Sequence, residues 1–179
     1  MLNLLKLSRG IDRMTRYIGY VAGVLLVVSC MISAGNASLR YMIGISSNAW
    51  LEIQWHLFVG AVMLGAPYVL QLNEHVRVDL VYGSVSARRK LWIDVFGMIL
   101  FLFPATALVG GMAWPFFVTA FESGEISSSA GGLILWPVKL ILPIGFGLLF
   151  LQGVSELIKR IAALAGFIEL NIAYEKPLQ

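Results

Sequence analysis

Three side chains able to do acid–base or hydrogen-bonding chemistry lie one helical turn apart in the first half of the sequence: Asn48, Glu52 and His56. Spacings of four residues place them on one face of a helix. Ionisable groups among apolar residues of a membrane helix usually face protein or water, which makes them candidates for function. We interpret this face as a polar stripe that hydrogen-bonds a neighbouring helix or a partner subunit. A direct part in transport is the alternative.

The two histidines, His56 and His75, invite comparison with haem ligands, but their spacing argues against it. They are 19 residues apart, which is about 28 Å along a continuous helix. One haem cannot take both as axial ligands within one chain. The sequence has no Cys-x-x-Cys-His motif, phosphate-binding glycine loop, His-Glu-x-x-His pattern or nucleophile elbow. We therefore expect that this chain is not an enzyme and that it holds no cofactor and no metal ion.

A charged string follows the same apolar stretch: Glu74-His75-Val76-Arg77-Val78-Asp79. It brings two carboxylates, a guanidinium and an imidazole to the end of a predicted helix. Arg77 is able to pair with either carboxylate or with a lipid phosphate. On chemistry alone, a solvated loop with incidental ion pairs is an equally good interpretation.

Composition sets the environment in which these residues act. The chain has 179 residues, of which 59% are hydrophobic and 13% charged, and its mean hydropathy is +0.83. Soluble proteins are about half apolar and about a quarter charged. A soluble fold of this length cannot hide so much apolar surface, so the solvent must be lipid. The sequence therefore excludes a soluble enzyme, and nothing in it suggests binding to nucleic acid.

Four apolar stretches are long enough to cross a bilayer, which takes about 20 residues as a helix. We expect an all-α integral membrane protein, a single membrane domain over residues 1–179, with spans at about 17–39, 50–72, 91–120 and 137–158. The glycine pairs Gly110-Gly111 and Gly145-x-Gly147 are predicted to allow close helix contacts. Pro104 and Pro115 are predicted to kink the third span.

The basic residues predict the orientation. Eleven of the 13 Lys and Arg residues lie in the N-terminal segment, the connection between spans two and three, or the C-terminal tail. This asymmetry predicts that both termini are cytoplasmic. The residues Leu2 to Tyr17 mix apolar and basic side chains, and we expect an amphipathic segment that lies along the membrane surface before the first span.

The charged string, in this setting, resembles a known family. His75-x-Arg77-Val78-Asp79 after the second span, preceded by Glu52-x-Gln54-Trp55, is similar to the small membrane subunit of tripartite ATP-independent periplasmic (TRAP) transporters, the DctQ-like family. The basic Arg88-Arg89-Lys90 before the third span, and Trp136-Pro137 with Pro143-Ile144-Gly145 in the fourth, support the resemblance, which covers residues 17–160.

The resemblance implies a division of labour in a bacterial inner membrane. A large membrane subunit carries the substrate and sodium sites, a periplasmic binding protein delivers the solute, and the small subunit braces the large one. Organic acids are the expected solutes. Glu52, His56, His75, Arg77 and Asp79 are then candidates for contact with the large subunit or for a structural role. The connection with Glu122 and Glu125 is a candidate for proximity to the binding protein, and membrane lipids are expected partners.

Two other functions are compatible with the residues alone. A small independent carrier or channel, acting as a homo-oligomer, would transport without any other chain. A respiratory membrane anchor carrying haem or quinone is the second, and a visible absorption spectrum would reveal it.

Overall fold

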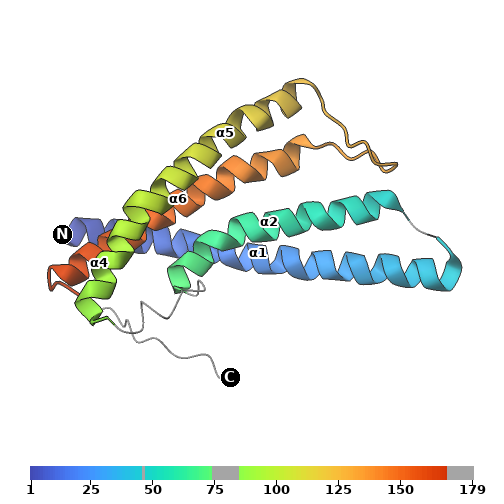
Figure 1. Ribbon diagram of the computed structural model, residues 1–179. Coiled ribbons are helices and arrows are strands. Elements are labelled where there is room, and N and C mark those ends of the chain that lie inside the picture. The colour runs from blue at the N-terminus through green and yellow to red at the C-terminus, as the bar shows by residue number, and fades with distance from the viewer. Residues whose placement is uncertain (46, 74–84, 169–179) are drawn as a thin grey trace.

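The computed structural model describes residues 1–45, 47–73 and 85–168, and within them the regular structure is helical (Figure 1). The helices are α1 (Leu2–Ile43), α2 (Asn48–Leu72), α4 (Ala87–Gly97), the π-helical turn η1 (Met98–Leu102), α5 (Phe103–Glu122) and α6 (Trp136–Leu164). An isolated bridge pairs Ile126 with Ile134 between α5 and α6.

The four predicted spans are confirmed as helices long and apolar enough to cross a membrane. The third begins four residues earlier than predicted, because α4, η1 and α5 form one helix over residues 87–122. The amphipathic segment Leu2 to Tyr17 is not separated from the first span by a break. It forms the first turns of α1, whose 42 residues are about 63 Å long.

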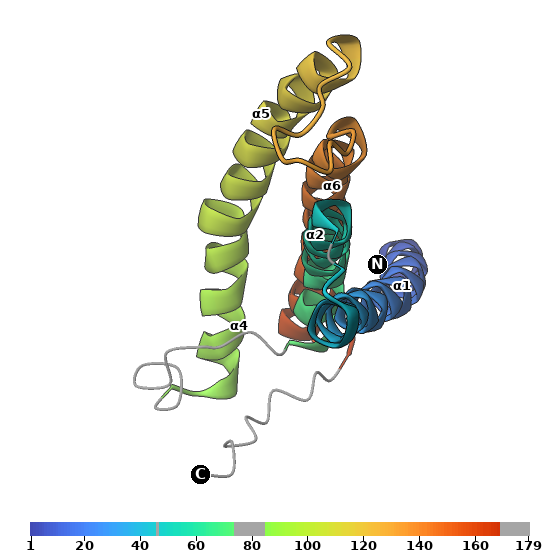
Figure 2. The same cartoon turned by 90° about the vertical axis from the view of Figure 1, so that its right-hand side faces the viewer.

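Two antiparallel helix pairs make up the molecule. α1 pairs with α2, and α5 pairs with α6 (Figures 1 and 2). The pairs lie close together where α6 ends and diverge toward the connection between α5 and α6. Since α6 contacts α1, α2, α4, η1 and α5, it is the central helix of the fold.

Small and polar residues at a seven-residue spacing make the buried face of α1. Seven residues are close to two helical turns, so such positions form one narrow stripe along a helix. Small side chains at these positions let helix backbones approach one another in a membrane. The buried residues of α1 are Ser8, Thr15, Ala22, Ser29 and Asn36.

The π-helical turn η1 shifts the same pattern by one residue in the third span. The buried positions Leu91 and Met98 are seven residues apart, and so are Thr106, Ala113 and Ala120. Between Met98 and Thr106, however, the spacing is eight. A π-turn inserts one extra residue into an α-helix, so η1 keeps both halves of the helix turned toward α6.

Pro104 accounts for the position of this turn. A proline inside a helix has no N–H and its ring clashes with the carbonyl four residues earlier. Here the N–H of Phe103 donates to the carbonyl of Met98, five residues back. The hydroxyl of Thr106 then donates to the carbonyl of Leu102 at 2.7 Å. Pro104 thus accompanies a widened turn, and the kink predicted for this span stays a prediction.

Glycine permits a close contact between α2 and α6. A Cβ atom on Gly145 would lie 2.9 Å from the backbone carbonyl oxygen and from two side-chain carbons of Met63. Gly110 likewise faces Phe146, where a Cβ would lie 3.1 Å from the Phe146 Cβ. The prediction of close contact is thus confirmed for these two glycines. It is wrong for Gly111 and Gly147, which have open space at that position.

These two kinds of glycine on α6 give a matched test. We expect Gly145→Ala to destabilise the protein by about 1–3 kcal/mol, because the new methyl group overpacks a rigid contact. Gly147→Ala is the control, and it should leave stability unchanged or raise it by up to about 1 kcal/mol, since alanine favours helix. Thermal unfolding of both variants in detergent measures the difference. Equal unfolding temperatures would contradict the assigned helix contact.

Candidate functional site

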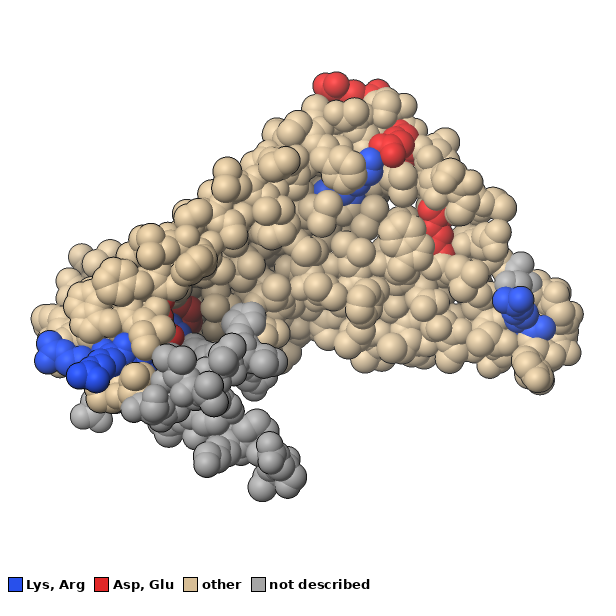
Figure 3. Space-filling model, in the orientation of Figure 1, with Lys and Arg blue, Asp and Glu red and all other residues tan. Residues whose placement is uncertain are grey.

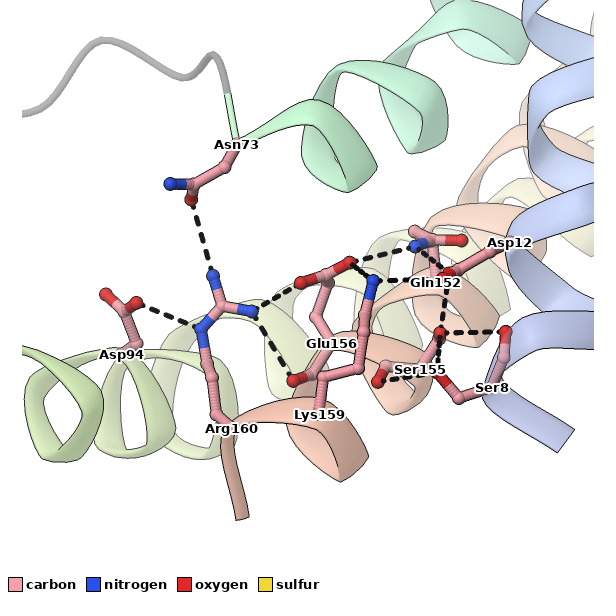
Figure 4. Close-up of polar contacts among 9 residues, drawn as sticks. All are labelled: Ser8, Asp12, Asn73, Asp94, Gln152, Ser155, Glu156, Lys159 and Arg160. Atoms are coloured by element: carbon pink, nitrogen blue, oxygen red, sulfur yellow. Dashed lines mark hydrogen bonds and ion pairs between the residues drawn. The ribbon is translucent and has the colours of Figure 1, made fainter. Parts of the chain in front are cut away.

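Five polar side chains of α6 share one face near its C-terminal end: Gln152, Ser155, Glu156, Lys159 and Arg160. Their spacing of three and four residues is that of an amphipathic stripe, but here the stripe is polar and points inward. Gln152 and Ser155 are fully buried, and Glu156 and Arg160 are 5% and 6% exposed. Together with Ser8, Asp12, Asn73 and Asp94 they form a network that we call the helix-end cluster (Figure 4).

Arg160 joins three helices on one side of the cluster. Its Nε donates to Asp94 of α4 at 2.9 Å, and its Nη2 donates to the side-chain oxygen of Asn73, directly after α2, at 3.3 Å. Its Nη1 pairs with the Glu156 carboxylate one turn earlier on α6. A guanidinium has five N–H donors in a fixed planar arrangement, so one side chain is able to hold α2, α4 and α6 together.

Asp12 of α1 is the meeting point on the other side of the cluster (Figure 4). Its carboxylate accepts hydrogen bonds from Gln152 at 2.9 Å, from Ser155 at 2.7 Å and from Lys159 at 3.1 Å. The Ser155 hydroxyl also lies 2.7 Å from that of Ser8. These contacts fasten the first turns of α1 to the end of α6.

Glu156 connects the two sides of the cluster, because it pairs with both Lys159 and Arg160 and accepts a hydrogen bond from Gln152 at 3.1 Å. The charges therefore alternate from α1 through α6 to α4. Removing charges from water costs several kcal/mol per ion, and only close partners and hydrogen bonds offset that cost. Among the described residues no group of three or more His, Cys, Asp or Glu is placed to hold a metal ion. What these ion pairs and hydrogen bonds do is join α1, α6 and α4.

The interpretation of the sequence missed this cluster. Lys159 and Arg160 entered that interpretation only among the basic residues of the C-terminal tail that predict the orientation, and Asp94 was not singled out. The signal was available, since polar residues recur at positions 152, 155, 156, 159 and 160, the spacing of one helix face. Asp12 and Asp94 are the acidic residues nearest the starts of their own helices, α1 and α4.

Glu52 lies at the opposite end of the molecule and binds a connection of its own chain. It is 2% exposed, and one carboxylate oxygen accepts hydrogen bonds from the Ser129 hydroxyl at 2.8 Å and the Leu133 N–H at 3.3 Å. These contacts hold the connection between α5 and α6 over the start of α2. Glu52 therefore has a structural role within the chain, and its predicted contact with another subunit stays a prediction.

The connection itself is an ordered hairpin. The N–H of Ser127 donates to the carbonyl of Leu133 at 2.9 Å, and the N–H of Leu135 donates to that of Glu125 at 3.0 Å. Gly131 lies so close to α2 that a Cβ atom would be 2.4 Å from the backbone nitrogen of Ala49. Only a residue without a side chain fits there.

His56, one turn after Glu52, lines an apolar pocket instead of joining these hydrogen bonds. Its ring lies against Trp55, with the ring centroids 4.5 Å apart. The buried Nε2 has no hydrogen-bond partner among the described residues. The pocket has a volume of about 560 Å³ and lies between α2, the hairpin and the start of α6. The shared face predicted for Glu52 and His56 thus leads to two different surroundings.

Of the remaining predicted residues, Glu122 and Glu125 lie within the described part of the chain. Glu125 pairs with Lys139 at the start of α6, and Lys139 lies 4.0 Å above the ring of Phe116. Glu122 is exposed at the end of α5. His75, Arg77 and Asp79 lie outside the described residues.

Arg160 offers the sharpest test of the helix-end cluster. We expect Arg160→Gln to cost about 3–5 kcal/mol of stability, because it leaves the buried carboxylate of Glu156 and the half-buried carboxylate of Asp94 without their guanidinium. Arg89→Gln on α4 is the control, since Arg89 is exposed and should change stability by less than about 0.5 kcal/mol. Chemical or thermal unfolding in detergent measures both. Similar losses in the two variants would contradict the assigned role of Arg160.

Comparison with known proteins places this architecture in a family. The family model of tripartite ATP-independent periplasmic transporters, DctQ component, matches residues 29–163. The match covers α2, α4, η1 and α5 completely, together with most of α6 and the last part of α1. No curated protein and no solved structure matches the chain. Because the family match covers most of the sequence and the four spans are present, the chain belongs to the DctQ family, the small membrane component of tripartite transporters.

Proposed function

We propose that this chain is a rigid brace for the large membrane subunit in sodium-coupled, binding-protein-dependent uptake of organic acids. The DctQ family works in a tripartite system with a large membrane subunit and a binding protein. The observation that carries the proposal is the helix-end cluster. Its charged side chains are occupied in tying α1, α2, α4 and α6 to one another, which suits a stationary frame.

The exposed surface of the helices supports a partner within the membrane. α1 presents Val24 and Met31, and α5 presents Leu108 and Met112, each more than 60% exposed. On the face drawn in Figure 3, the wide stretch between the two ends of the helices carries almost no charge. Such faces require lipid or another membrane protein against them. We propose that spans one to three offer these faces to the large subunit, with Glu52 and His56 near the contact.

The proposed orientation puts both termini in the cytoplasm of a bacterium, with the chain in its inner membrane. The start of α1, the start of α4 and the end of α6 lie at the same end of the molecule (Figure 1), and most basic residues lie in or next to these segments. This agrees with the excess of Lys and Arg on cytoplasmic loops of membrane proteins. We assign sodium and the solute to the large subunit.

Purification of the tagged chain from its native membrane in mild detergent tests the proposal. We expect a large membrane subunit to copurify in a fixed ratio, and we expect uptake in reconstituted vesicles only when both subunits and the binding protein are present. Uptake by this chain alone, as a homo-oligomer, would overturn the proposal in favour of an independent carrier.

The charged string after α2 gives a more specific prediction for the same complex. We expect Arg77→Ala and Asp79→Ala to lower the yield of copurified large subunit or the rate of uptake, without changing which solute is accepted. A control of similar charge change is Arg40→Ala, an exposed residue near the end of α1. Unchanged yield and uptake in both variants would remove the string from the proposed interface.

The outer hairpin is the proposed neighbour of the docked binding protein. Glu122→Cys, in a chain whose own Cys30 is changed to serine, should form a crosslink to binding protein that carries a thiol-reactive crosslinker. The unaltered chain, which keeps exposed Cys30 on α1 and has Glu122 in place, is the control for background labelling. Absence of the crosslink while transport continues would count against this location.

A further inference from the structure

The first turns of α1 extend past the end of α2. Tyr68 of α2 packs against Gly19 of α1, and α2 ends at Leu72, one turn later. The part of α1 before about residue 16 therefore runs alongside α6, and Ser8 and Asp12 fasten it there. Figure 1 shows α1 continuing beyond α2 toward the N-terminus.

Four cations form a stripe along this extension. Lys6, Arg9, Arg13 and Arg16 are separated by three, four and three residues, which places them on one face of the helix. All four are exposed. The stripe extends over about 15 Å of helix axis, so it faces several anionic groups in a row and not a single one.

The carboxylate nearest to this stripe is turned away from it. Asp12 is the only acidic residue before Glu52 in the sequence, and its carboxylate accepts hydrogen bonds from α6. Within the described residues the four cations make no ion pair, and Arg9 donates only to the carbonyl of Leu5 at 3.3 Å. None of the described residues neutralises the positive charge of the stripe.

The other exposed side of the same turns is apolar. Leu4, Leu7 and Met14 are 48%, 54% and 39% exposed, and at 100° per residue they lie roughly opposite the cationic stripe. A helix that exposes a cationic stripe and an apolar stripe on opposite sides suits the boundary between lipid tails and headgroups. An acidic protein surface would match the cations and leave the apolar side unexplained.

We infer that Lys6, Arg9, Arg13 and Arg16 form a binding surface for the headgroups of anionic phospholipids, with Leu4, Leu7 and Met14 in the adjoining acyl layer. In the orientation proposed above, this surface lies at the cytoplasmic leaflet, and that location rests on the proposed function. The affinity for anionic headgroups does not rest on it, because it follows from the charge and exposure of the stripe. Each cation at such a surface strengthens binding about fivefold.

Native mass spectrometry of the full-length chain in mild detergent, titrated with phosphatidylglycerol or phosphatidylcholine, tests the inference. We expect the wild-type chain to bind phosphatidylglycerol in preference to phosphatidylcholine. The variant K6Q/R9Q/R13Q/R16Q should lose the preference, and Arg13→Gln alone should weaken binding of phosphatidylglycerol about fivefold. Arg40→Gln, at the other end of the same helix, is the matched single control and should leave binding unchanged.

A second control keeps the charge. The variant R9K/R13K/R16K should retain the preference for phosphatidylglycerol, and circular dichroism should show the same helix content in all variants. Equal binding of the two lipids by the wild-type chain, or undiminished binding of phosphatidylglycerol by the quadruple variant, would overturn the inference. So would a quadruple variant that binds this lipid normally and no longer copurifies with the large subunit.

The assay contains no other protein, so its result is separate from the proposed function. A chain that binds phosphatidylglycerol through the stripe but recovers no large subunit would support the inference and contradict the proposed function.

Discussion

Hydrocarbon gives a polar side chain no hydrogen-bond partner, so every charge carried into a membrane helix must find one within the protein or at the headgroups. In this chain the charges of the helix-end cluster meet one another at one end of the bundle. Asp12, Glu156 and Asp94 alternate with Lys159 and Arg160 across α1, α6 and α4. Because a buried charge without its partner is costly, the relative positions of these helix ends are fixed more firmly than apolar contacts alone would allow. The divergence of the helix pairs away from this end is consistent with that constraint.

Different interactions hold the two ends of the bundle. At one end, ion pairs join helices whose side chains are long enough to reach across a gap. Toward the middle and the other end, small residues bring backbones together directly, as at Gly145 against Met63 and Gly131 against Ala49. In lipid there is little hydrophobic drive between helices, so close packing and hydrogen bonds supply the attraction. The hairpin bound to Glu52 adds polar contacts where the helix pairs are furthest apart.

Much of the architecture could be predicted from the sequence, because a span requires only length and apolarity, and both are local properties. The four spans and the shared face of Glu52 and His56 are of this kind. What those residues touch was not predictable, since the hairpin that reaches Glu52 begins some 70 residues later and its path depends on the packing of α5 on α6. The helix-end cluster was predictable in part. The spacing of Gln152, Glu156 and Arg160 could have indicated a polar face, although the sequence analysis did not use it, and only the three-dimensional structure shows that Asp12 and Asp94 complete it. The orientation in the membrane and the roles of His75, Arg77 and Asp79 stay predictions.

The length of α1 has a mechanical consequence. A bilayer with its headgroups is about 40–45 Å thick, whereas the 42 residues of α1 extend for about 63 Å. To stay within the bilayer, the helix must incline by roughly 45° from the normal, well beyond the ~20° average for membrane helices. An inclined helix of this length occupies a longer stretch of the membrane plane than an upright one. It would therefore oppose both sideways movement and rotation of a subunit attached to it. A neighbour that moves cargo across the bilayer would gain a fixed reference against which to move.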